Sequence, residues 1–165
     1  MTRSLLADAF GHHHWATLRL MDTCTALSDE QLATTVPGTF GSILDTMRHL
    51  VGAERSYLFV CAGGDLPEVD DAVMSLAELR AAMEPTGAAW ATFLATDPDP
   101  DLTVTRHRDD GTKSHAPLGL RLAQVVHHGT DHRSQIATAL TSLGVTPPDM
   151  DVWDYAWSEG RISED

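Results

Sequence analysis

Two histidines with helical spacing are the side chains that most directly suggest chemistry in this sequence. His128 and His132 lie four residues apart in a segment whose apolar residues recur at steps of three and four. Both imidazoles therefore project from one helix face, about 6 Å apart along the axis. Such a pair can chelate one metal ion. Buried histidines that only make hydrogen bonds are the more common case, so the pair alone leaves both interpretations open.

Gly129 occupies a position on the apolar stripe of the same segment, directly after His128. In the interior of a helix a glycine costs about 1 kcal/mol relative to alanine, so the missing side chain is expected to make room for something. A bound ion or ligand is one candidate, and a closely crossing helix is the other.

A third metal ligand would have to come from another helix. His49 is the only histidine inside a predicted helix apart from those of the last long helix and the N-terminal cluster at 12–14. Taking Met47, Leu50 and Leu58 as the buried stripe of its helix places His49 nearly on the opposite side. The spacing alone therefore does not bring His49 to His128.

The elements that would position these histidines are long helices. Helical periodicity, capping boxes and Pro or Gly stops predict four of them, at about 4–27, 42–61, 75–95 and 117–143, and a further helical turn at 28–31. β-prone residues around a turn at 109–111 predict a small hairpin between 102 and 117. The sequence thus predicts an all-α fold, a four-helix bundle with a small β-hairpin before the last long helix. The tail is expected to lie back on the helices through Trp153, Tyr155 and Trp157.

The composition is that of an ordinary globular protein, with 165 residues, 42% of them apolar and 21% charged, which predicts one domain over residues 1–165. The net charge is −13 and stays negative even with all nine histidines protonated, which argues against a nucleic-acid partner. No stretch is long and apolar enough for a membrane span or a secretory signal, so the cytoplasm is the expected location. Two isolated cysteines do not suggest a disulfide scaffold.

Residues 127–135, with the sequence HHGTDHRSQ, resemble the closing motif of the DinB-like (damage-inducible) superfamily, whose members are regarded as metal-dependent enzymes. His49, in the sequence DTMRHL at 45–50, is similar to the family's first ligand. The hairpin and the tail at 148–157 are also similar, so the resemblance covers nearly the whole chain. It implies a four-helix bundle with a long crossover connection, a divalent metal held by His49, His128 and His132, and a homodimer.

Three neutral imidazoles leave coordination positions open, which is typical of a catalytic ion rather than a structural one. Zinc is the default metal, and nickel or iron is compatible with nitrogen ligands. Such an ion can activate water or a thiol at neutral pH. Several relatives in the family are thiol S-transferases or thiol-dependent isomerases that use bacillithiol, mycothiol or glutathione. The resemblance therefore favours a low-molecular-weight thiol as cosubstrate for a small-molecule substrate.

Two other functions remain open at this stage. The first is a metallohydrolase in which the ion activates water. Its weakness is that Gly129 stands where the HExxH motif has its glutamate base. The second is a nonenzymatic, stress-related binding protein in which the histidines hold a stabilising metal or none.

The other polar residues of these segments are expected to have structural roles. Successive residues lie 100° apart on a helix, so His12, His13 and His14 are expected mainly at solvated or rim positions. Arg133 and Gln135 are expected to make hydrogen bonds between helices or between subunits. The hairpin histidines are left unassigned, either at the mouth of the site or on the surface; they are His107 and His115.

Overall fold

The computed structural model describes residues 4–63 and 72–164. Its fold is mostly helical, with one two-stranded antiparallel sheet in the described residues. The helices are α1 (Leu5–Cys24), α2 (Asp29–Leu32), α3 (Ile43–Ala62), α4 (Leu76–Met83), α5 (Thr86–Leu94), α6 (Leu118–Ser142) and α7 (Val152–Ser158), and the strands are β1 (Thr103–His107) and β2 (Lys113–Pro117). At this level the predicted helical class with a small hairpin is confirmed.

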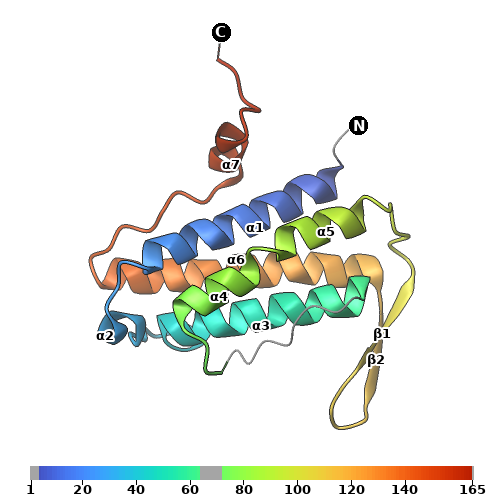
Figure 1. The fold of residues 1–165 in the computed structure, drawn as a ribbon, viewed down its shortest axis with the longest axis horizontal. Coiled ribbons are helices and arrows are strands. Elements are labelled where there is room, and N and C mark those ends of the chain that lie inside the picture. The colour runs from blue at the N-terminus through green and yellow to red at the C-terminus, as the bar shows by residue number, and fades with distance from the viewer. Residues whose placement is uncertain (1–3, 64–71, 165) are drawn as a thin grey trace.

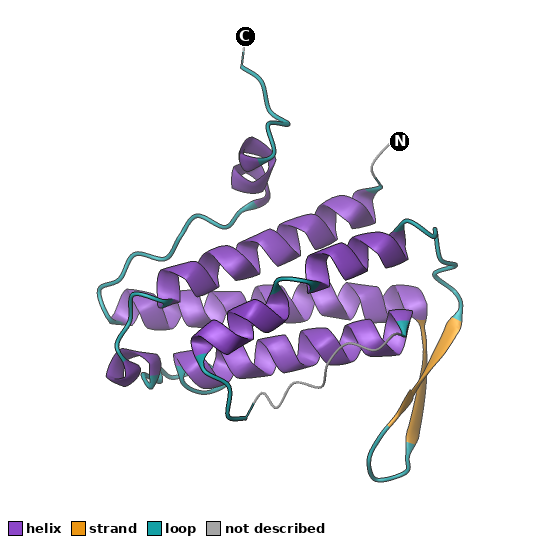
Figure 2. Ribbon diagram, in the orientation of Figure 1, coloured by secondary structure: helices purple, strands orange, loops and turns teal. Residues whose placement is uncertain are grey.

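The long helices run side by side, as Figure 1 shows. Helix α3 packs along α6, α1 packs against α5 and α6, and α4 and α5 follow one another along the same side of the molecule. The hairpin projects from one end, as the orange arrows in Figure 2 show. The helices that carry His49 and His128 are therefore neighbours.

Helix starts and stops follow the residues that predicted them. Ser28 and Ser75 each begin a helix with a complete capping box, and the Ser42 side chain accepts a hydrogen bond from the backbone N–H of Asp45 at the start of α3. Gly144 follows the end of α6 with φ +74°, a conformation that side chains other than glycine rarely adopt. Local signals thus set most of the boundaries.

The predicted helix at 75–95 is wrong as a single element, because the structure divides it into α4 and α5 at Glu84 and Pro85. Proline has no backbone N–H, and its ring clashes with the carbonyl four residues earlier, so it breaks or kinks a helix. The hydroxyl of Thr86 donates a hydrogen bond to the carbonyl of Met83, with the two oxygens 2.7 Å apart. This bond satisfies one of the carbonyls that the break leaves without a helical partner.

The prediction for the tail is correct for one aromatic residue and wrong for two. Tyr155 on α7 is 5% exposed, packs against Trp15 and fills the space above Gly11 on α1. Trp153 and Trp157 are 71% and 48% exposed. Residues two apart in a helix point about 200° away from each other. When Tyr155 faces the bundle, Trp153 and Trp157 therefore point away from it.

The buried apolar residues form two clusters, one on each side of a polar layer. The first cluster includes Leu20, Leu50 and Ile136, and the second includes Phe10 and Val125. Between them along α1, α3 and α6 lie buried polar side chains: His13, Thr17, Glu54 and Arg133. No helix among the described residues is long and apolar enough to cross a membrane.

Candidate metal centre

Three imidazoles from two helices converge on one point. His49 on α3 and His128 on α6 place their Nε2 atoms 3.1 Å apart. The ring of His132 lies 4.8 Å from that of His49 and 4.4 Å from that of His128, measured between centroids. One nitrogen from each ring lies within 4.8 Å of the other two. The structure thus brings together the three histidines that the family resemblance implied.

The spacing of these nitrogens fits a single metal ion. Metal–nitrogen bonds of 2.0–2.1 Å place two ligand atoms about 2.9 Å apart at a right angle and about 3.4 Å apart in a tetrahedral site. The His49–His128 distance of 3.1 Å lies between these values. The widest pair, at up to 4.8 Å, would have to close by up to about 1.4 Å to reach the tetrahedral spacing. The donor set of three neutral imidazoles suits zinc and also nickel or iron.

Gln135 orients the third imidazole. Its side-chain oxygen lies 3.2 Å from Nδ1 of His132 and 2.9 Å from the backbone nitrogen of Phe40. Because an amide oxygen only accepts, Nδ1 of His132 carries the proton and Nε2 keeps its lone pair for a ligand. Gln135 thus joins α6 to the loop before α3, whereas a hydrogen bond between helices or between subunits was expected, and it also fixes the tautomer of His132.

Two aromatic rings flank the three histidines. The Phe40 ring stacks on His49, with centroids 4.1 Å apart and planes inclined by 15°. The Tyr57 ring meets His128 edge-on, with centroids 5.6 Å apart, and its hydroxyl accepts a hydrogen bond of 3.4 Å from Gln124. One aromatic residue thus lies toward each end of the site along α3.

His128 is uncharged at neutral pH. Burial, together with the neighbouring imidazoles of His132 and His49, lowers the pKa of His128 to about 4. A neutral imidazole has a lone pair to offer a metal. At neutral pH no proton has to leave His128 before it can act as a ligand.

A buried polar layer lies on the inner side of the same helices. Nε2 of His13 is 2.9 Å from Oε2 of Glu54, and Trp90 donates its indole N–H to Oε1 of the same carboxylate at 2.6 Å. Arg133 donates to Nδ1 of His13 at 3.0 Å and to the hydroxyl of Thr17 at 3.1 Å. Because a guanidinium only donates, Nδ1 of His13 accepts from Arg133, and Nε2 of the same ring is directed at Glu54.

The charges of this layer are held inside the fold. Burial alone raises the pKa of Glu54, but its interaction with His13 and the hydrogen bonds from His13 and Trp90 more than offset burial, so the pKa lies below its ordinary value. Burial lowers the pKa of Arg133 to about 10, against the opposing charge of Glu54. At neutral pH the carboxylate and the guanidinium are both ionised, on either side of the His13 imidazole.

The expectation that the histidines at 12–14 occupy solvated or rim positions is wrong for His13, which is fully buried. His12 is half-buried, and its Nε2 atom lies 2.8 Å from the carbonyl oxygen of Met150. His14 is half-buried and packs against Gly87. The signal for His13 is its position on α1 with Phe10, three residues before it, and Thr17, four residues after it, which places it on the inward stripe.

The space at Gly129 accommodates a side chain of another helix. A Cβ built on Gly129 would overlap the ring of His13 and come within 2.9 Å of a guanidinium nitrogen of Arg133. Of the two candidates from the sequence, the close approach of a neighbouring helix is therefore correct.

The hairpin histidines lie outside the group of three. Nδ1 of His115 is 2.9 Å from the hydroxyl of Thr105 on the facing strand, and His107 is exposed. Arg121 on α6 anchors the hairpin by donating to the carbonyls of Val104 and Ser114.

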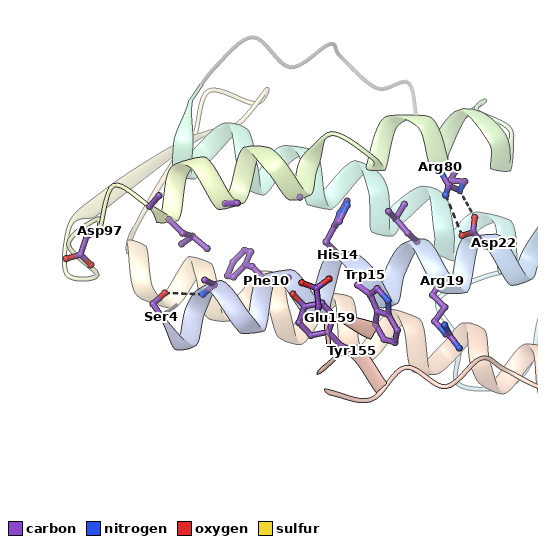
Figure 3. Close-up of a pocket in the computed structure, with 17 residues that line it drawn as sticks. Ser4, Phe10, His14, Trp15, Arg19, Asp22, Arg80, Asp97, Tyr155 and Glu159 are labelled. Atoms are coloured by element: carbon purple, nitrogen blue, oxygen red, sulfur yellow. Dashed lines mark hydrogen bonds and ion pairs between the residues drawn. The ribbon is translucent and has the colours of Figure 1, made fainter. Parts of the chain in front are cut away.

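A cavity of about 880 Å³ lies elsewhere, between α1 and the α4–α5 segment and next to α7. Figure 3 shows Phe10 and His14 on its wall, and the ion pair of Asp22 with Arg80 at one end. None of the three converging histidines lines it.

These observations define a helical protein with a candidate three-histidine metal centre between two neighbouring helices. The sequence profile of the DinB family matches residues 1–165, and the chain belongs to that family. No curated protein matches the chain, so the family profile is the comparison on which this assignment depends.

Proposed function

We propose that the chain is a metal-dependent enzyme in which His49, His128 and His132 hold one divalent cation, with zinc as the default and nickel or iron as compatible metals. The cation, when bound, lowers the pKa of a coordinated thiol or water and so supplies a nucleophile at neutral pH. We propose a thiol S-transferase or thiol-dependent isomerase, with a low-molecular-weight thiol as cosubstrate and a small-molecule substrate.

The convergence of the three imidazoles carries this proposal. Three protein ligands leave at least one coordination position of a tetrahedral ion for a substrate atom. Gln135 keeps the lone pair of His132 available, and the low pKa of His128 keeps its imidazole neutral. In a transfer step the thiol sulfur forms a bond to an electrophilic carbon. The bond from that carbon to its leaving group breaks, the leaving group takes the electron pair, and the thiol proton passes to solvent.

The thiol reaction needs less from the protein than hydrolysis does. A metallohydrolase of the usual kind has a carboxylate beside the metal to take a proton from water. In the part of the chain that the structure describes, the group that could hold a metal consists of histidines alone, so none of its members is a carboxylate base. A thiol, with its lower pKa, loses its proton to solvent without such a base.

We also propose an architecture, an oligomeric state and a cellular location for the protein. We infer a four-helix bundle whose fourth rod is the kinked α4–α5 pair, with a long crossover connection. We also infer a homodimer, located in the cytoplasm, with no nucleic-acid partner. The family membership and the net charge of −13 support these inferences.

Elemental analysis of protein purified without an affinity tag tests the metal site. About one equivalent of a divalent metal per chain is expected in the wild type, much less in His49→Ala, and the wild-type amount in His115→Ala, a histidine outside the group. Equal metal content in all three proteins would contradict the ligand set.

A second experiment tests the reaction. The metal-loaded protein is incubated with monochlorobimane and, in turn, with bacillithiol, mycothiol, glutathione and cysteine. Turnover with at least one thiol, lost in His49→Ala, supports the proposal. No turnover with any thiol would reject the thiol reaction while leaving the metal site in place.

A further inference from the structure

Phe40 is an exposed aromatic residue beside the candidate metal centre. Its side chain is 57% exposed, and it belongs to neither apolar cluster of the described residues. Its backbone nitrogen donates to Gln135, and the hydroxyl oxygen of Thr39 lies 2.9 Å from the carbonyl oxygens of both Val36 and Gly41 in the same turn. The backbone of this turn is therefore anchored, and the Phe40 ring, which contributes little to the core, packs against His49.

The orientation of this ring relates it to the metal position. The Phe40 ring is nearly parallel to the imidazole of His49, at 15°, and nearly perpendicular to that of His132, at 84°. A metal bound to an imidazole nitrogen lies close to the plane of that imidazole. The Phe40 ring thus lies at stacking distance, with centroids 4.1 Å apart, from the plane in which His49 directs a metal. The Phe40 ring therefore borders two of the three converging imidazoles, those of His49 and His132, and a flat group bound beside them would have an aromatic ring as its neighbour.

We propose that Phe40 is a specificity-determining residue that selects substrates with a flat unsaturated group, aromatic or conjugated, next to the atom that binds or reacts at the metal. This inference rests on the proposed metal site of His49, His128 and His132, and it names the substrate class of that site. In the thiol reaction, the electrophilic substrate is then an aromatic or conjugated compound, because the cosubstrate thiols named above are polar and largely saturated.

Stacking explains why a flat group is preferred over a saturated one of similar size. Two aromatic rings in contact gain about 0.5–1.5 kcal/mol beyond the burial of their apolar area, which corresponds to about 2- to 10-fold in affinity. A saturated ring is thicker and lacks the π-system, so it gains only the burial term. The preference should therefore disappear when the ring of Phe40 is replaced by an aliphatic side chain of similar polarity.

A binding experiment with the Co²⁺-loaded protein tests this inference without an activity measurement. The probes are benzohydroxamate and cyclohexanecarbohydroxamate, which share a metal-binding group and differ in the ring. The Kd of each is measured from the visible absorption of Co²⁺ in the wild type, Phe40→Leu and Phe59→Leu. Phe59 lies on α3 and is 62% exposed, but it contacts none of the three histidines in the ring contacts of the described residues.

The ratio of the two Kd values is the informative quantity, because any intrinsic difference between the probes is the same in all three proteins. Phe40→Leu is expected to reduce the preference for benzohydroxamate by about 2- to 10-fold, and Phe59→Leu to leave it unchanged. An unchanged ratio in Phe40→Leu overturns the inference and leaves the metal site standing. Failure of the wild type to bind Co²⁺ overturns the proposed function and the inference together.

Discussion

Replacing Gly129 by alanine should destabilise the fold, although alanine is the better helix former. A Cβ at this position would lie 2.5 Å from Nδ1 of His13, which is about 0.9 Å inside the 3.4 Å at which ordinary contact begins. The His13 ring cannot retreat easily, because Glu54 holds one of its nitrogens and Arg133 the other. Overpacking of a core costs up to about 3 kcal/mol, against about 1 kcal/mol gained in helix propensity. The expected net loss is about 2 kcal/mol.

Urea denaturation followed by circular dichroism measures this loss, and thermal denaturation should show a Tm lower by about 4–8 °C. Ser134→Ala is the matched control, because Ser134 is exposed on the same helix and its replacement brings only the gain in propensity. A Gly129→Ala protein as stable as Ser134→Ala would refute the argument that the glycine makes room for His13.

The remaining predictions concern the buried carboxylate and the metal. Glu54→Gln should cost about 3–5 kcal/mol in urea denaturation, because His13 and Trp90 bind different carboxylate oxygens, one of which becomes a non-accepting NH2 group, and because Arg133 loses its counter-charge. The exposed Glu84→Gln should cost under about 0.5 kcal/mol. The pKa of Glu54 is lowered in the folded state, so its stabilisation is present above the unfolded-state value of about 4.5 and is lost as the pH falls through the folded-state value. Wild-type stability measured from pH 7 to pH 3 should therefore fall more steeply than that of Glu54→Gln, and parallel curves would exclude this role. A chelator should lower the Tm of the wild type and leave that of His128→Ala unchanged, and equal shifts would place the metal elsewhere.

Much of the fold could be predicted because its boundaries depend on local chemistry. Serine caps begin α2, α3 and α4, and a glycine with positive φ follows α6. The break at Pro85 is hard to predict because the capping box at Ser75 and the Asp-Pro stop near Asp97 outline a helix of ordinary length. The proline lies inside that outline and is itself the signal that should have divided it.

The site could be predicted only in part, because two of its features depend on packing between helices. α3 buries residues over a wide face, from Thr46 to Leu58, since it packs against α4 and α5 as well as α6. His49 lies at the edge of that face, which a single apolar stripe cannot reveal. Glu54 is four residues from both Leu50 and Leu58 on the stripe, so its burial could have been predicted, but its partners on α1 and α5 could not.

One segment of α6 serves both the metal centre and the polar layer. His128 and His132 face His49, while the residues that follow each of them, Gly129 and Arg133, face His13 on α1. Successive residues on a helix point about 100° apart, so two pairs at a spacing of four present two adjacent faces to two different helices. The polar layer thus fixes the rotation of α6 about its own axis, because any rotation that moved Arg133 would leave buried charges without partners. The same constraint holds the two imidazoles toward α3, and a metal centre assembled from two helices gains its rigidity from contacts made to a third.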